Sequence, residues 1–227
     1  MMSYTEALIG FFRQHRQVEQ AKMMERYMRN QFPFLGIKTP ERTLLLRRFF
    51  QEHGKPTFHQ LNSIIEVLWN EPEREFQYVG LSLLEKNKKK LTVKQLPWIE
   101  TLVTTKSWWD TVDHLASSIT GEIGKRDMEG SQKILEEWVT SDNMWLNRTA
   151  ILFQLKFKES TDAEILFKFI RLHKESNEFF LQKAIGWALR EYSKTNPDLV
   201  INFIEAEPLA SLSKREGLKY IKAKRNA

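Results

Sequence analysis

A short stretch rich in tryptophan and aspartate is the part of this sequence best suited to chemistry. Residues 105–113 read TKSWWDTVD, so that Trp109 and Asp113 are four residues apart. On a helix, side chains at positions i and i+4 lie over one another on one face. A carboxylate beside apolar surface needs a cationic partner, because otherwise its pKa rises or its burial costs several kcal/mol. This pair is therefore the first candidate for a functional site.

Two kinds of cation could face Asp113. An arginine from a neighbouring repeat would make the carboxylate structural and Trp109 a packing residue. A cationic substrate would make the carboxylate catalytic. An Asp113 side chain that is satisfied by an internal ion pair and turned away from the binding surface would count against the catalytic interpretation.

A second candidate surface combines cations with an aromatic ring. Lys183, Trp187, Arg190 and Lys194 recur at i, i+4, i+7 and i+11, which places them along one side of a helix predicted at 177–193. The simplest interpretation is a solvated basic face, but an exposed tryptophan within such a face is unusual. Lys and Arg bind phosphates, and an aromatic ring can contact sugar or base. The pattern therefore favours binding to a nucleic-acid backbone.

The elements that position these residues are predicted to be helices. Segments such as Thr39-Pro40-Glu41 and Asn196-Pro197-Asp198 combine an N-cap residue, a proline and an acid in the first turn. No segment alternates apolar and polar residues as a strand would, and no apolar run reaches the roughly 18 residues of a membrane span. With 41% hydrophobic residues among 227, the chain is long and apolar enough to fold around a core. The helix signals predict that this fold is all-α.

One of these helices is expected at 106–119. Its apolar stripe would consist of Trp108, Val112, Leu115 and Ile119, spaced at i, i+4, i+7 and i+11. This spacing predicts that Trp108 belongs to the core, whereas the neighbouring Trp109 does not.

The helices follow a repeat. Four segments can be superposed on Gln77, Asp110, Asn147 and Gln182, which are 33, 37 and 35 residues apart. Such a period is typical of helix pairs in which each unit covers the apolar face of the next. We therefore predict a single domain over residues 1–227, a curved α-solenoid of HEAT-like repeats with one concave surface.

Composition narrows the possible chemistry. The absence of cysteine excludes disulfides, thiolate nucleophiles and cysteine-bound metals, and the five histidines have no metal-ligand spacing. A formal net charge of +6 suits a polyanionic partner. The N-terminal segment MMSYTEALIGFFRQH reads as an amphipathic helix and not as a secretory signal, so a cytoplasmic location is expected.

Six stretches together resemble one known family. They are FPFLGIKTPERTLLL (32–46), EPEREFQ (71–77), TKSWWDTVD (105–113), SDNMWLNRTAILFQLKFK (141–158), EFFLQKAIGWALREYSKTNPD (178–198) and LSKRE (212–216). In content and spacing they are similar to the bacterial alkylpurine DNA glycosylases of the AlkD type, which are built from HEAT-like repeats. The resemblance extends over nearly the whole chain.

The resemblance implies a catalytic carboxylate on the concave surface, flanked by two tryptophans, with an arginine nearby. The matching residues are Asp113, Trp109, Trp187 and Arg148. Further residues are expected to contact DNA. They are Tyr27, Thr39, Lys106, Ser107, Lys156, Arg190 and Lys214 by resemblance, and Lys183 and Lys194 from the basic stripe.

The function implied is hydrolysis of the N-glycosidic bond of cationic N3- or N7-alkylated purines in double-stranded DNA. The resemblance implies an enzyme that acts without extruding the base into a protein pocket. The sequence has no evident lysine nucleophile for Schiff-base chemistry, so no lyase step is expected. No cofactor or metal is expected either, and a monomer is expected because a solenoid with polar ends is commonly monomeric. Two other functions fit the same residues. A HEAT-repeat scaffold would bind protein partners and would not need Asp113, and a DNA-binding protein without chemistry would use only the basic face.

Overall fold

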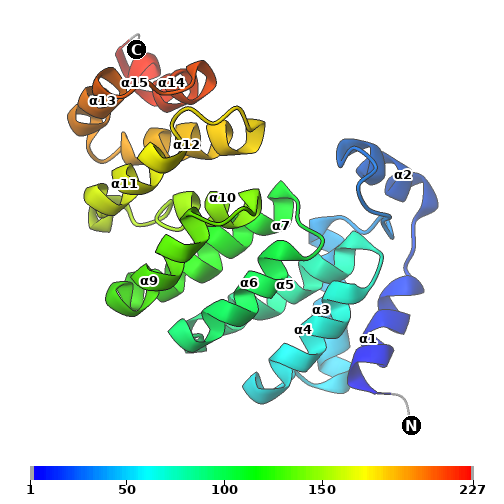
Figure 1. Cartoon of the computed structure of the whole chain (residues 1–227). Helices are drawn as coiled ribbons and strands as arrows, with labels where there is room; N and C mark the ends of the chain where they lie inside the picture. Colours follow the sequence, from blue (N-terminus) through cyan, green and yellow to red (C-terminus); the bar gives the residue numbers. More distant parts are fainter. Residues whose placement is uncertain (1–2, 226–227) are drawn as a thin grey trace. The chain divides into compact units, whose positions relative to one another are not determined.

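The computed structural model describes residues 3–225, which form fifteen α-helices, short 3-10 turns and one π-helical segment, with no β-strand in that range (Figure 1). The predicted all-α class is confirmed. No helix within these residues is long and apolar enough to cross a membrane. The chain divides into two compact units, with the boundary after Asn87. The single domain and its curvature stay predictions.

Unit 1, as far as it is described, has five α-helices. They are α1 (Tyr4–Arg13), α2 (Val18–Tyr27), α3 (Thr39–His53), α4 (Leu61–Asn70) and α5 (Arg74–Asn87), with a 3-10 turn, η1 (Phe58–Gln60), before α4. Figure 1 shows α4 and α5 side by side, and their apolar residues form much of this unit's core.

A buried carboxylate holds the loop that precedes α3. Glu75, in the first turn of α5, accepts the backbone N–H groups of Leu35 (2.9 Å), Gly36 (2.9 Å) and Ile37 (3.0 Å). Burial raises the pKa of Glu75, and these N–H groups oppose the rise. Gly36 has φ of 89°, and a Cβ there would lie 2.2 Å from the carbonyl oxygen of Gln17, so only glycine fits.

Unit 2 begins at Lys88, and its described part holds the remaining ten α-helices. They are α6 (Leu96–Thr104), α7 (Trp109–His114), α8 (Gly121–Arg126), α9 (Met128–Val139), α10 (Met144–Leu152), α11 (Ala163–His173), α12 (Phe179–Tyr192), α13 (Pro197–Ala206), α14 (Ser211–Gly217) and α15 (Lys219–Arg225). The 3-10 turns η2 (Lys88–Lys90), η3 (Val93–Gln95) and η5 (Lys158–Ser160) lie between helices, and the π-helical segment η4 (Leu115–Thr120) joins α7 to α8. α10 packs against both α9 and α12, and α12 packs closely against α14.

The same hydrogen bonding of side-chain amides recurs at three of the four aligned positions of the predicted repeat. Gln77 Nε2 donates to the carbonyls nine, eight and six residues earlier, at 3.0, 3.1 and 2.9 Å. Asn147 Nδ2 donates to the carbonyls at the same offsets, at 3.0, 3.1 and 2.8 Å. Gln182 Nε2 donates to the carbonyl six residues earlier at 2.8 Å. These bonds satisfy carbonyls left open where the preceding helix ends. Asp110, the fourth aligned residue, has no amide with which to do this.

The helix predicted at 106–119 begins three residues later than expected. Lys106 has φ of 50°, in the left-handed region, and Trp108 is an extended N-cap with φ of −158°. Helical backbone cannot pass through either conformation, so α7 starts at Trp109. Thr39 is likewise the first residue of α3 and not its N-cap, which is Lys38.

The core stripe of that helix is correct except for Trp108. Val112, Leu115 and Ile119 are fully buried, although η4 has i→i+5 bonding. Trp108 is only half-buried and instead packs edge-on against Phe180, with ring centroids 5.1 Å apart. Its extended backbone removes it from the helical face on which the spacing argument placed it.

We expect Asn147→Ala to lower the free energy of unfolding in urea by about 2 kcal/mol, because three carbonyls at the end of α9 lose their donor. Asn202→Ala is the matched control, since Asn202 is exposed on α13, and it should change stability by less than about 0.5 kcal/mol. Equal effects of the two substitutions would show that the amide bonds of Asn147 contribute nothing specific.

Candidate active site

The structure places Asp113 opposite Arg148, which projects from α10. Arg148 Nε donates to Asp113 Oδ1 at 2.7 Å, and Nη2 donates to Oδ2 at 2.9 Å. The side chain of Asp113 is 16% exposed and that of Arg148 is 5% exposed. This is a bidentate pair, the strongest geometry between a guanidinium and a carboxylate. The arginine anticipated as a partner for Asp113 is therefore present, and it comes from the next aligned segment.

The position of Arg148 follows from its neighbours along α10. Asn143 caps the helix by accepting the N–H of Trp145 at 2.9 Å, and Asn147 fastens α10 to the end of α9. A third N–H of Arg148, on Nη1, donates to the carbonyl of Phe180 in the first turn of α12. Asn147 thus fixes α10 against α9, and the Phe180 carbonyl of α12 holds the guanidinium itself, so its orientation toward Asp113 is set before any ligand binds.

Burial raises the pKa of the Asp113 carboxyl above its ordinary value. The hydrogen bonds and charge of Arg148 oppose this rise, and the charge of Asp110, one turn earlier on α7, adds to it. Each oxygen of Asp113 accepts one bond from Arg148, and a carboxylate oxygen has a second lone pair. The Asp113 carboxylate thus accepts hydrogen bonds from the fixed guanidinium of Arg148 on one side and keeps lone pairs for another donor.

The two predicted tryptophans lie on the helices that meet this pair. Trp109 is the first residue of α7, one turn before Asp113, and is half-buried. Trp187 lies about two turns beyond Phe180 on α12. It is half-buried against the apolar core of unit 2, and not the exposed ring that the stripe predicted. That core includes Ile185 and Ala188 of the same helix.

The basic stripe on α12 is not simply solvated, which corrects the simplest interpretation. Lys183 and Arg190 both face Glu216 of α14, with Nζ to Oε1 at 3.2 Å and Nη1 to Oε2 at 3.5 Å. Glu216 is buried. Nothing in the charge pattern of the sequence indicated that it would face the cations of α12. Lys194 lies two residues beyond the end of α12 and pairs with Glu191 of that helix at 2.7 Å.

The other predicted DNA contacts belong to both units and to several different elements. Lys156 is exposed and donates to Ser118 Oγ in η4. Ser107 Oγ donates to the Val103 carbonyl at 2.6 Å, beside Lys106. The remainder lie elsewhere: Lys214 on α14 in unit 2, and Tyr27, 74% exposed at the end of α2, and Thr39 in unit 1.

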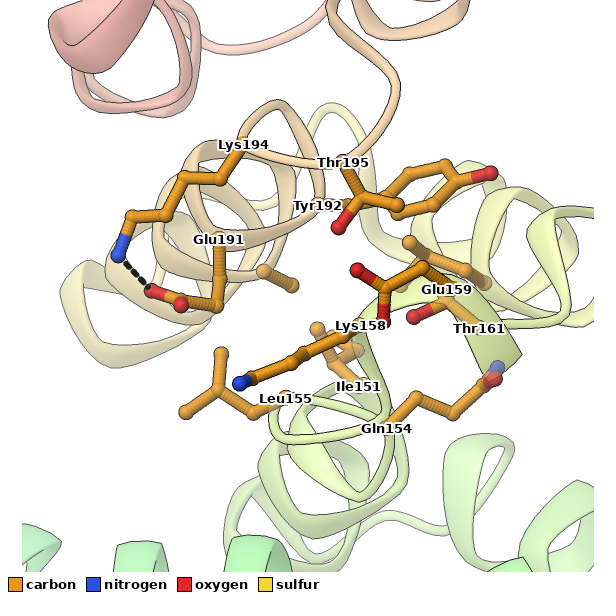
Figure 2. Close-up of a pocket in the computed structure, with 12 residues that line it drawn as sticks. Ile151, Gln154, Leu155, Lys158, Glu159, Thr161, Glu191, Tyr192, Lys194 and Thr195 are labelled. Atoms are coloured by element: carbon orange, nitrogen blue, oxygen red, sulfur yellow. Dashed lines mark hydrogen bonds and ion pairs between the residues drawn. The ribbon is translucent and has the colours of Figure 1, made fainter.

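A cavity of about 160 Å³ lies in unit 2 between the chain after α10 and the end of α12 (Figure 2). Its lining includes Gln154, Lys158, Glu191, Tyr192 and Lys194, and none of the four predicted catalytic residues. Figure 2 shows the ammonium of Lys194 directed to Glu191 at its edge. Within the described residues, no three His, Asp or Glu side chains are grouped closely enough to hold a metal ion.

Sequence reasoning missed three contributors to these sites. The carbonyl of Phe180 has no sequence signal, since any residue supplies one. Asp110 was visible as an acid one turn before Asp113, but its effect on the pKa of Asp113 depends on their separation in space. Glu216 stood in the stretch LSKRE, where its neighbours Lys214 and Arg215 concealed its role.

Comparison with known proteins places the chain in a family. The profile of the DNA alkylation repair enzyme family matches residues 9–221. A solved structure described as a predicted DNA alkylation repair enzyme from Enterococcus faecalis superposes with a TM-score of 0.85 and is 35% identical. The match covers 91% of this chain and 97% of that one. A comparison with curated proteins gave no match. Because the family profile spans nearly the whole chain, this protein belongs to the DNA alkylation repair enzyme family.

Proposed function

We propose that this protein is a monofunctional DNA glycosylase. Its substrates are purines in double-stranded DNA that carry a positive charge after alkylation at N3 or N7, such as 3-methyladenine and 7-methylguanine. It hydrolyses the N-glycosidic bond and leaves an abasic site. The observation that carries the proposal is the partly exposed carboxylate of Asp113, held in a bidentate pair by Arg148 within this family's fold.

The substrate's charge explains why one carboxylate is enough. An alkylated purine departs as a neutral base, so the leaving group needs no general acid. Glycoside hydrolases, whose leaving groups must be protonated, generally use two carboxylic groups. As the bond stretches, positive charge develops on the deoxyribose. A fixed carboxylate such as Asp113 stabilises that charge and orients the attacking water with its remaining lone pairs.

Arg148 acts as a positioning residue in this proposal. A carboxylate in a largely buried site tends to take up a proton, and a protonated Asp113 would give no charge stabilisation. The guanidinium favours the ionised form and fixes the orientation of both oxygens. Because Arg148 is anchored to the Phe180 carbonyl, it holds this position without help from the substrate.

The tryptophans would complete the site by contact with the sugar. A ring face of Trp109 or Trp187 toward the deoxyribose provides cation–π attraction to the developing charge, worth ~0.5–2 kcal/mol each, and excludes water. Both rings are half-buried, which supports them as fixed surfaces that retain an open face. We propose further that the enzyme holds the duplex backbone at the lesion, without base extrusion and without a Schiff-base lyase step.

An ion pair as complete as that of Asp113 also fits a structural residue. In a scaffold or a DNA-binding protein without chemistry, Asp113 and Arg148 would only join α7 to α10. The 16% exposure of Asp113 and the family match favour the enzyme. The three functions separate in one assay, because only the glycosylase releases free base.

We expect the protein to release free base from duplex DNA that contains 7-methylguanine, and Asp113→Asn to slow single-turnover release by roughly 100-fold or more. DNA binding by the variant should remain near that of the wild type. Asp110→Asn is the matched control, because it removes a carboxylate one turn away on α7, and it should keep most of the activity. Equal release by wild type and Asp113→Asn would remove Asp113 from the mechanism.

We expect Arg148→Lys to move the acidic limb of the pH–rate profile to higher pH. The active form of Asp113 is ionised, so release falls as pH drops through its pKa. Arg148 lowers that pKa against the effect of burial, and the loss of the bidentate contact lets it rise. Rates measured from pH 5 to 9, corrected for spontaneous depurination, test this. A uniform loss of rate with an unmoved limb would contradict the proposed control of ionisation.

A further inference from the structure

Three cations from two helices of unit 2, α12 and α15, surround one buried carboxylate, that of Glu216 on α14. Glu216 Oε1 lies 2.7 Å from Lys219 Nζ and 3.2 Å from Lys183 Nζ, and Oε2 lies 3.5 Å from Arg190 Nη1. Lys219 belongs to α15, whereas Lys183 and Arg190 are seven residues apart on α12. The mechanism proposed above uses neither Glu216 nor Lys219.

The carboxylate reaches this place because α12 carries a glycine there. A Cβ at Gly186 would lie 2.4 Å from the Cβ of Glu216, so a larger residue would push α14 away. Ser213 Oγ also donates to the carbonyl of Gln182 at 3.0 Å, which fixes α14 one turn earlier. The Glu216 side chain is therefore seated against α12 beside Trp187, between the two cations of that helix.

Charge and exposure show which groups face the solvent. Three positive charges meet one negative charge, which leaves a local excess of two positive charges. The side chains of Lys183, Arg190 and Lys219 are 38%, 33% and 51% exposed, whereas that of Glu216 is 7% exposed. An ammonium has three N–H donors and a guanidinium five, so each cation retains donors that Glu216 does not occupy. An approaching anion therefore meets the cations first.

We propose that Lys183, Arg190 and Lys219 form one binding site for a phosphate of the DNA backbone, and that Glu216 is the positioning residue that holds their side chains together. This site deepens the proposed function and rests on its DNA-binding part. Long cationic side chains lose rotamer freedom when they clamp a phosphate, and a carboxylate that already restrains them reduces that loss. Trp187, which is proposed to contact the sugar, lies between Lys183 and Arg190 on the same face of α12, so the phosphate site adjoins the proposed sugar contact.

A competing role for Glu216 is that of a mask, which the phosphate must displace. The two roles predict opposite signs for Glu216→Gln, which keeps the shape of the side chain and removes its charge. Removal of a mask would tighten binding to DNA. Removal of a positioning residue would weaken binding, although the protein gains positive charge. Glu216→Asp adds a second distinction, because it keeps the charge but is one methylene too short to reach all three cations.

The experiment measures the dissociation constant of full-length protein for an undamaged duplex over a series of salt concentrations. We expect Glu216→Gln and Glu216→Asp each to weaken binding by roughly threefold to tenfold, with a smaller dependence of log K on log[salt]. Tighter binding by Glu216→Gln would overturn the positioning role in favour of masking. Wild-type affinity in both variants would overturn the role of Glu216 altogether.

Lys219→Ala tests the site itself and does not depend on the fold tolerating a change at the buried Glu216. It should weaken binding and lower the salt slope by up to about 0.9, the value for complete loss of one phosphate contact. Lys168→Ala is the matched control, because Lys168 is 56% exposed on α11 and pairs with the single carboxylate of Glu136 at 2.7 Å. An effect of Lys219→Ala no larger than that of Lys168→Ala would overturn the proposed phosphate site.

The assays separate this proposal from the glycosylase proposal. If the wild type releases no alkylated base while the Glu216 and Lys219 variants lose affinity as expected, the glycosylase proposal fails and the phosphate site stands. If the wild type releases base while these variants bind undamaged DNA as the wild type does, the phosphate site is wrong and the glycosylase stands.

Discussion

The burial of a carboxylate beside an aromatic ring is the constraint on which the candidate site depends. Asp113 is largely removed from water, and an uncompensated charge there would cost several kcal/mol. Arg148 meets that cost through two parallel hydrogen bonds. The orientation of the arginine must itself be fixed. The Phe180 carbonyl at the start of α12 bonds the guanidinium, and Asn147 fastens α10 to the end of α9. The packing of α9, α10 and α12 thus sets the geometry of one ion pair.

The repeat explains how that ion pair arises between distant parts of the chain. In two aligned segments an amide side chain, Gln77 or Asn147, bonds the open carbonyls of the preceding helix with the same offsets. Arg148 directly follows Asn147, so the bonds that fix Asn147 to the preceding helix also fix the position of the arginine. In the segment of Asp113 the aligned amide is replaced by Asp110, and the helix turns into the π-helical segment η4. The candidate catalytic residue therefore lies where the repeat is least regular. π-helical turns are frequently found at functional sites.

Carboxylates with cationic partners recur in unit 2 with different consequences. Asp113 has one partner, which is more buried than Asp113 itself, so the carboxylate is the group that remains partly open. Glu216 has three partners, all more exposed than itself, so the cations are the groups that remain open. The first arrangement suits stabilisation of a positive charge, and the second suits binding of a negative one. The proposed glycosylase, which would act on a cationic sugar within a polyanion, would use both.

Helix signals and spacing in the sequence were enough to predict the all-α class, the repeat and the pairing of Trp109 with Asp113 on one face, because these are local properties. The choice of Arg148 as a site residue followed from the resemblance to a known family. Only the tertiary structure decided that Asp113 meets Arg148, that α7 begins at Trp109, and that the basic stripe of α12 faces Glu216. These features depend on backbone dihedral angles and on contacts between helices that are far apart in sequence. Periodicity defines the face of a helix on which a side chain lies, whereas the partner on that face is set by packing.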